Sequence, residues 1–108
     1  MDKMLFVVES NCADPKREEE FNKWYNGTHL PDVLEVPGVL RAVRYQRIDT
    51  SEGQAKYLAL YEIETDDFQA LAKAAGENME KKKAEGRDSD LLQGTSSGTF
   101  KQIYSLSK

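Results

Sequence analysis

The chain has 108 residues with a formal net charge of −4, and its pI is about 5.0, so its charge gives no attraction for nucleic acid. Hydrophobic residues at 39% and charged residues at 31% exclude a disordered chain and predict one folded domain over residues 1–108. No apolar run approaches the roughly 20 residues of a membrane span, and the N-terminus is too poor in apolar residues for a signal peptide, so we expect a cytoplasmic protein without membrane contact.

A strand and then a helix are predicted at the start of the chain. The apolar run within residues 3–11 favours a strand that is buried on both faces or nearly so. Asp14 suits the N-cap and Pro15 the first position of a helix that we expect to run to Asn26. Cys12 is the single cysteine, and we expect it to pack at the end of the strand because it has no cysteine to pair with.

The end of this helix is predicted from two residues that disfavour regular helix. Gly27 is expected to weaken or end it, and Pro31 is expected to push Leu30 out of the α-helical region. His29, the only histidine, then lies beside the last backbone carbonyls, where a positive imidazolium is favoured. Residues 31–36 can form one further short helical turn.

The middle of the chain predicts a hairpin of two strands. After a tight turn at residues 37–38, residues 39–49 have the pattern of a long strand, residues 50–54 that of a loop, and residues 55–64 that of the next strand. Both faces of this last strand are largely apolar. Because one layer of helices covers only one face of a sheet, the other face predicts a homodimer.

A second helix and a final strand are predicted for the rest of the chain. Residues 65–67 are expected to cap a helix that Gly86 ends. Residues 87–98 are polar and small and favour a loop, and residues 99–106 favour a strand. The order strand, helix, strand, strand, helix, strand predicts an α+β, ferredoxin-like βαββαβ fold, in which two helices cover one face of a four-stranded antiparallel sheet.

His29 is the candidate for chemistry. Its ordinary pKa lies near neutrality, so it can take and give protons at working pH. Aromatic neighbours on the helix supply the wall of a pocket for a hydrophobic or planar ligand, and strand tyrosines add hydroxyl donors. The predicted ligand-contacting residues are Trp24, Tyr25, Tyr45, Tyr57 and Tyr61. The alternative interpretation is that His29 only caps the helix and packs under a strand.

Nearby charges leave two further points open. Asp32 can orient the imidazole of His29, or it can be an ordinary charge at the start of a helix. Arg41, Arg44 and Arg47 do not all share one face of their strand, because Arg44 is odd-spaced to the other two. At least one of the three is expected to be a surface charge.

The sequence predicts neither a cofactor nor a metal. One histidine and one cysteine do not make a zinc site with the usual spacing. No glycine-rich phosphate loop follows a predicted strand, and no Gly-x-Ser-x-Gly motif is present. The expected ligand is therefore a small organic molecule that the apolar pocket holds without help from a bound ion.

Three segments together resemble the dimeric α/β-barrel superfamily, and its EthD-like branch in particular. They are Phe-Asn-Lys-Trp-Tyr at 21–25, His-Leu-Pro-Asp at 29–32 and Pro-Gly-Val at 37–39, with a further similar segment at 56–62. The resemblance covers nearly the whole chain. It implies a ferredoxin-like protomer whose sheet packs against that of a second copy, with a pocket between sheet and helices.

The same resemblance implies a set of activities. Members of the superfamily include polyketide cyclases, muconolactone-type isomerases, dehydratases of aromatic polyketides and cofactor-free monooxygenases, and in several of them a histidine at the pocket transfers the proton. By its position in the motif, His29 carries that role here, with Trp24 and Tyr25 as wall residues. The additional histidines of some cyclases and haem-binding relatives are missing from this sequence.

Three hypotheses about function follow from these observations. In the first, His29 is the general acid or base of a cofactor-free cyclase, dehydratase or isomerase that acts on an aromatic, carbonyl-bearing metabolite. In the second, the dimer binds a hydrophobic ligand without converting it. In the third, the protein is a cofactor-independent monooxygenase.

Overall fold

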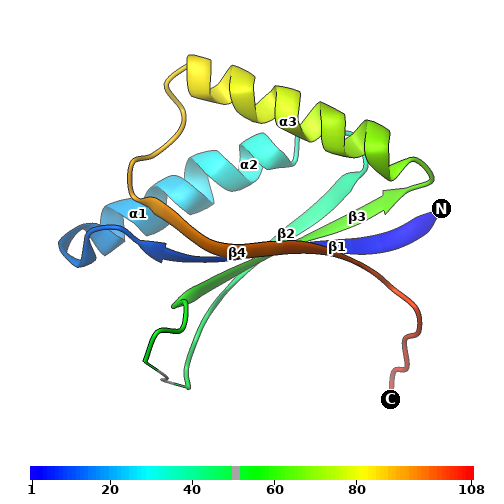
Figure 1. Ribbon diagram of the computed structural model, residues 1–108, viewed down its shortest axis with the longest axis horizontal. Coiled ribbons are helices and arrows are strands. Elements are labelled where there is room, and N and C mark those ends of the chain that lie inside the picture. Colours follow the sequence, from blue (N-terminus) through cyan, green and yellow to red (C-terminus); the bar gives the residue numbers. More distant parts are fainter. Residues whose placement is uncertain (50–51) are drawn as a thin grey trace.

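The computed structural model describes residues 1–49 and 52–108, and two residues of the predicted 50–54 loop, Thr50 and Ser51, lie outside the described residues. A four-stranded antiparallel sheet in the order β2-β3-β1-β4 forms one layer, and the helices cover one of its faces (Figure 1). This confirms the predicted α+β, ferredoxin-like arrangement. The strands are β1 (Asp2–Cys12), β2 (Val39–Gln46), β3 (Tyr57–Thr65) and β4 (Leu92–Lys101).

The first helical segment is longer than predicted and changes its winding along the way. It runs through a 3-10 turn (Pro15–Arg17), α1 (Glu18–Trp24), a π-helical turn (Tyr25–His29) and α2 (Leu30–Val33). The predicted helix end near residue 26 is therefore wrong.

Leu30 shows most clearly why the predicted helix end fails. Its backbone is α-helical, with φ −60° and ψ −47°, although Pro31 follows it. The N–H of Leu30 donates to the carbonyl of Tyr25, five residues back, as in a π-helix. The wider turn accommodates both Gly27 and a proline that has no N–H to bond, so the helix continues where a regular α-helix would break.

The second helix, α3 (Phe68–Ala84), has the predicted caps. The side chain of Asp67 accepts from the N–H of Ala70 at 3.1 Å. At the other end Gly86 takes φ +75°, its N–H donates to Lys83, and the following N–H of Arg87 donates to Lys82 at 2.9 Å. This is the Schellman pattern, in which a glycine ends the helix.

The segment predicted as a loop over residues 87–98 is wrong in its second half, because β4 begins at Leu92. Ser97 pairs with Val8 and Gly98 with Val7 of β1, so backbone pairing to a central strand overrides the weak strand preference of small residues. The strand also ends earlier than predicted, at Lys101. Residues 102–108 have no regular structure and are exposed.

The core lies between the sheet and the helices. Strand β3 points alternate residues toward it, and Tyr57, Ala59, Tyr61 and Ile63 are all buried. Phe21 of α1 is fully buried against them. Cys12 is buried at the last position of β1, as expected.

The turn before β2 brings the helical segment back to the sheet. Gly38 has φ +98°, and a Cβ at this position would lie 2.7 Å from Cδ1 of Leu71 and 3.2 Å from the carbonyl of Glu64. The backbones of Gly38 and Glu64 are also hydrogen-bonded, because the N–H of Glu64 donates to the carbonyl of Gly38 at 2.9 Å. Both the backbone angle and the close approach require glycine.

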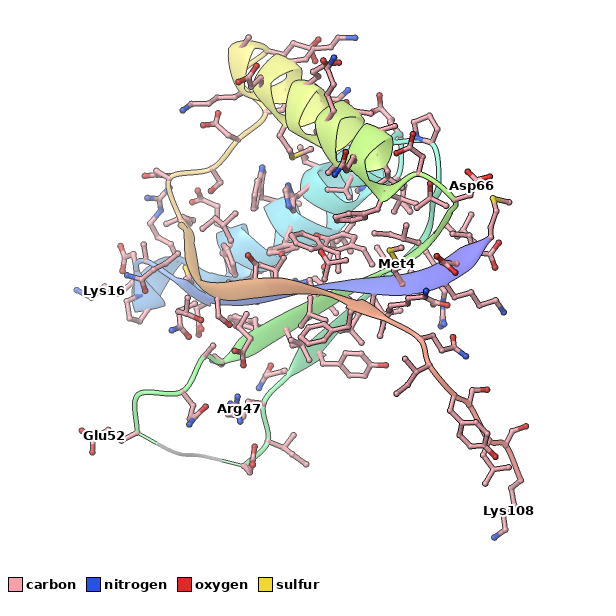
Figure 2. All side chains as sticks on the ribbon, turned by 45° about the vertical axis from the view of Figure 1, so that its right-hand side comes forward. Met4, Lys16, Arg47, Glu52, Asp66 and Lys108 are labelled. Atoms are coloured by element: carbon pink, nitrogen blue, oxygen red, sulfur yellow. The ribbon has the colours of Figure 1, made fainter. Side chains whose placement is uncertain are left out.

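Among the described residues, no helix covers the other face of the sheet (Figure 1). Large side chains stand exposed there, including Leu40 at 59%, Tyr45 at 53% and Phe100 at 60%. The segment that leads to Lys108 also extends away from the sheet, on the side opposite the helices (Figure 2). No helix in the described part of the chain is long and apolar enough to cross a membrane.

Candidate functional site

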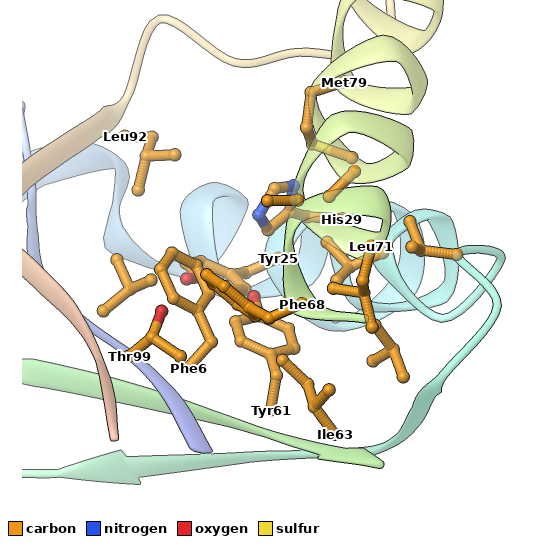
Figure 3. A pocket seen from close by; sticks show the side chains of 16 residues that line it. Phe6, Tyr25, His29, Tyr61, Ile63, Phe68, Leu71, Met79, Leu92 and Thr99 are labelled. Carbon is orange, nitrogen blue, oxygen red and sulfur yellow. The ribbon is translucent and has the colours of Figure 1, made fainter. Parts of the chain in front are cut away.

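A cavity of about 360 Å³ lies between the sheet and the helices (Figure 3). The sheet supplies Phe6 and Tyr61, the π-helical turn supplies Tyr25 and His29, and α3 supplies Leu71 and other apolar residues. The lining is almost wholly apolar, with a few polar groups from tyrosine, histidine and threonine. Its size and character are those of a small-molecule site.

The π-helical turn carries the two polar helix residues that line the cavity. Tyr25 and His29 are its first and last residues, and both side chains line the cavity. Single π-helical turns within longer helices are often found at functional sites. Figure 3 shows Tyr25, His29 and Tyr61 facing the same space between the sheet and α3.

The imidazole of His29 is held between two aromatic rings. The indole of Trp24 is stacked on it with ring centroids 4.9 Å apart, and the Tyr25 ring meets it edge-on at 4.9 Å. Burial lowers the pKa of His29 below its ordinary 6.5, and the charge of Arg44 lowers it further, while Asp32 acts in the opposite direction. His29 is thus a neutral base near pH 7.

The expectation that His29 is a cation at a helix end is therefore wrong. The helix continues past His29 into α2, so the open carbonyls that would favour a positive imidazolium are not beside it. A neutral imidazole in an apolar wall is suited to accept a proton from a bound molecule.

The structure brings three of the six predicted site residues to the cavity, Tyr25, His29 and Tyr61. Trp24 lies behind His29 instead, and its Nε1 donates to the carbonyl of Arg87 at 2.9 Å. The indole therefore positions the imidazole and does not line the cavity itself.

The remaining two tyrosines lie elsewhere. Tyr57 is buried beside α1, where its hydroxyl donates to Glu18 at 3.0 Å and accepts from Asn22 at 3.3 Å. Tyr45 is 53% exposed on the uncovered face of the sheet, and thus on the side away from the cavity. Alternation along a strand fixes which face a residue takes but not which face carries the helices.

Asp32 does not hold the imidazole by a hydrogen bond. Its carboxylate is buried and accepts from Nε and Nη2 of Arg87 at 2.8 and 2.9 Å. These charge-assisted bonds lower the pKa of Asp32 below its ordinary 3.8. The pair joins α2 to the segment after α3, close to the Trp24 contact with Arg87, and so fixes the frame around His29.

His29 also borders a second, smaller hollow of about 210 Å³, which is lined in part by α3 and the segment that follows it. Its walls combine apolar side chains with charged ones, among them Asp32, Lys82 and Arg87. Met79 and Leu92 line both spaces, so they and His29 lie between the apolar cavity and the smaller hollow.

Arg44 lies near the site, although the sequence did not predict it as a site residue. It lies on the inner face of β2, and its guanidinium carbon is 4.1 Å from the ring centre of Tyr25 and 5.1 Å from that of Tyr57. These contacts are cation–π interactions of a half-buried guanidinium. Its odd spacing from Arg41 and Arg47 indicated a different strand face, which the structure confirms, but not that this face is the inner one.

Four buried polar atoms at or near the cavity have no hydrogen-bond partner in the described part of the protein. They are the hydroxyls of Tyr25 and Tyr61 and the Nε and Nη2 atoms of Arg44. Burial raises the pKa of both tyrosines, so both keep their protons and remain donors. No group of three histidine, cysteine or acidic side chains within residues 1–49 and 52–108 is arranged to hold a metal ion.

Solved structures with the same architecture were found over nearly the full chain. HapK from Hahella chejuensis superposes with a TM-score of 0.69 at 13% identity, over 97% of each chain. SnoaB from Streptomyces nogalater, a cofactor-independent oxygenase, gives 0.65 at 17% identity over 100% of each chain. The haem-degrader MhuD from Mycobacterium tuberculosis, with two haems in its active site, gives 0.65 at 21% identity over 96% of this chain and 99% of its own.

The chain has the fold of the dimeric α+β-barrel, EthD-like superfamily. This confirms the resemblance that the Trp-Tyr, His-Leu-Pro-Asp and Pro-Gly-Val segments indicated. A scan of family models against the sequence gives no match, and neither does a search of curated proteins. At these identities the likeness to the superfamily's solved structures establishes the fold.

Proposed function

We propose that the cavity binds an aromatic, carbonyl- or hydroxyl-bearing small molecule and that His29 removes a proton from it. The observation that carries this proposal is a neutral imidazole in the wall of a largely apolar cavity. Apolar lining selects a hydrophobic ligand, and a base with a lowered pKa is free to accept a proton at neutral pH. The reaction needs no cofactor, because the proton is the only group that His29 moves.

The fate of the deprotonated ligand separates two reaction classes. In a cyclase, dehydratase or isomerase, the carbanion or enolate rearranges within the cavity. In a cofactor-independent monooxygenase, it reacts with molecular oxygen. The similarity to SnoaB, described as a cofactor-independent oxygenase, favours oxygenation as the second candidate.

We also propose that two copies of the chain pack through the uncovered sheet face. Leu5, Leu40, Tyr45 and Phe100 are exposed there, and with the half-buried Leu60 they line one hollow that charged residues also border. A cluster of exposed apolar side chains of this kind marks an interface on a folded protein. Pairing would cover the second apolar face of β3 while leaving the cavity on the opposite side of the sheet.

The proposed proton transfer is tested with 2-tetralone, an aromatic ketone with acidic hydrogens beside its carbonyl. In deuterated buffer near pH 7, the protein is expected to exchange these hydrogens faster than buffer alone does, as followed by proton NMR. His29→Gln should abolish the acceleration while the far-ultraviolet circular dichroism stays unchanged. Exchange that His29→Gln leaves intact would disprove the role of His29.

The same sample distinguishes the alternatives. Tyr45→Phe is the matched control, because Tyr45 lies on the far face of the sheet. This variant should exchange the hydrogens of 2-tetralone as fast as the unmodified protein does. Oxygen uptake with 1,4-dihydroxynaphthalene, lost in His29→Gln, would assign the monooxygenase class. Binding of 2-tetralone without exchange or oxygen uptake would indicate a protein that only binds its ligand.

A further inference from the structure

Two tyrosines in the cavity wall carry buried hydroxyls that the protein itself does not satisfy. The side chains of Tyr25 and Tyr61 are 1% and 2% exposed, and neither hydroxyl has a partner within residues 1–49 and 52–108. Buried polar groups are nearly always hydrogen-bonded, and leaving a donor unpaired is costly. Two such hydroxyls at one apolar cavity therefore point to an acceptor that comes from outside the chain.

The two hydroxyls form one group within the cavity. The two hydroxyls interact, and through this interaction each tyrosine changes the other's pKa. Their geometry does not meet that of a hydrogen bond, and a bond between them would use one O–H and leave the second without an acceptor. Most of the other lining residues, among them Phe6, Ile63 and Leu71, offer nothing to bond with.

The charge behind these hydroxyls is positive. The guanidinium of Arg44 lies over the Tyr25 ring, with its carbon 4.1 Å from the ring centre. One of its nitrogens donates to Asn26 at 2.9 Å, and the other two are buried without a partner. No carboxylate in the described part of the chain forms an ion pair with Arg44. This charge favours a partly or fully negative oxygen on the ligand.

We propose that Tyr25 and Tyr61 form an oxygen-binding subsite for a ketone carbonyl of the ligand, with Arg44 as the charge behind it. This subsite rests on the proposed function, and its ligand is an aromatic ketone that can form an enolate. His29 breaks the C–H bond next to the carbonyl and keeps the proton. The electron pair moves onto the carbonyl oxygen, which the two tyrosine hydroxyls bind.

Affinity for a matched pair of probes tests the subsite. Tetralin and 2-tetralone have the same ring system and differ by one carbonyl oxygen, so the ratio of their dissociation constants measures recognition of that oxygen. We expect calorimetry to show that 2-tetralone binds more tightly. Tyr61→Phe and Tyr25→Phe should each reduce this ratio about fivefold, which corresponds to one hydrogen bond. The affinity for tetralin should stay the same.

Thermal stability without ligand separates a binding role from a structural one. Because the two hydroxyls are unpaired in the folded chain, Tyr61→Phe and Tyr25→Phe should leave Tm unchanged or raise it. Tyr57→Phe is the control, since the Tyr57 hydroxyl bonds Glu18 and Asn22 outside the cavity. It should lower Tm and leave the ratio of affinities as it is.

Each result has a distinct meaning. Equal affinity for the two probes would overturn the subsite, and if the protein still exchanges the hydrogens of 2-tetralone, the proposed function of His29 stands. A loss of Tm in both phenylalanine variants with an unchanged ratio would assign the hydroxyls a structural role and overturn the subsite. If neither probe binds, the subsite and the proposed function are both overturned.

Discussion

The indole of Trp24 is stacked on the imidazole of His29, with the ring centroids 4.9 Å apart and the planes inclined by 22°. Trp24 is the only tryptophan, so the intrinsic fluorescence of the protein comes from the ring that touches the candidate base. The protonation of His29 is therefore measurable through the fluorescence of Trp24.

The first prediction concerns the titration of His29. Burial lowers its pKa, so the fluorescence of Trp24 should change on acidification with a midpoint below 6.5, as the imidazolium forms against the indole. His29→Gln should remove the transition. A midpoint at or above 6.5 would contradict the buried, neutral imidazole.

Stability should follow the same titration. Because the folded pKa is the lower one, the unfolded chain binds the proton more readily between the two values. The contribution of neutral His29 to the free energy of unfolding is complete above about pH 6.5. It is lost as the pH falls from about 6.5 toward the pKa of His29 in the folded protein. Urea denaturation at several pH values measures this effect. The free energy of unfolding should fall with pH in this range for the unmodified protein but not for His29→Gln.

The second prediction concerns the ion pair of Asp32 and Arg87. Asp32→Asn should lower Tm at pH 7, because it removes one partner of two short charge-assisted bonds at a buried carboxylate. Glu20→Gln, in an exposed pair with Arg17, is the control and should leave Tm nearly unchanged.

The pH dependence of this pair has the sign of a lowered carboxyl pKa. The stabilisation by Asp32 is complete above its ordinary 3.8 and is lost as the pH falls through the lower folded value. Asp32→Asn should therefore flatten the acid limb of the curve of Tm against pH. An equally steep acid limb in the variant would mean that other carboxylates control acid unfolding.

The third prediction compares two glycines that should respond in opposite directions to alanine. Gly38→Ala should cost about 2 kcal/mol, because the position has φ +98° and a Cβ would overlap Leu71. Gly76→Ala lies on the exposed side of α3 with nothing within 4 Å, and it should stabilise the protein by about 0.5–1 kcal/mol. Urea denaturation measures both, and a stable Gly38→Ala would show that the turn can take another form.

The fourth prediction concerns the uncovered sheet face. Light scattering of the unmodified protein should give a mass near twice 12.3 kDa. Leu40→Glu places a charge in the apolar patch and should reduce the mass to that of one chain. Lys73→Glu, on α3, should not. A single-chain mass for the unmodified protein would contradict the proposed dimer.

The sequence predicts the order of the elements because its local signals agree with the fold. The apolar pattern of β3, the N-cap at Asp67 and the glycine at position 86 each specify one element or one boundary, and the structure has all of them. The final strand is predicted, but its first part, residues 92–98, is missed because serine and glycine carry no strand preference, and only pairing with β1 makes them a strand.

The site is harder to predict because it depends on how the helix changes its winding. The π-helical turn adds one residue between Tyr25 and Leu30, which turns every later side chain by about 100° relative to a regular α-helix. Tyr45 and Arg44 are adjacent, and period-2 alternation puts them on opposite faces. Only the packed helices decide that Arg44, the charged one, is on the inside.

The place of His29 between the apolar cavity and the smaller hollow has a consequence for turnover in the proposed reaction. There the imidazole receives a proton from the ligand on one side and releases it on the other, past Asp32 and Lys82. The base is then reset while the product is still bound. Proton release and product departure are then separate steps. If one of them limits turnover, a change in the rate of the other leaves turnover unaffected.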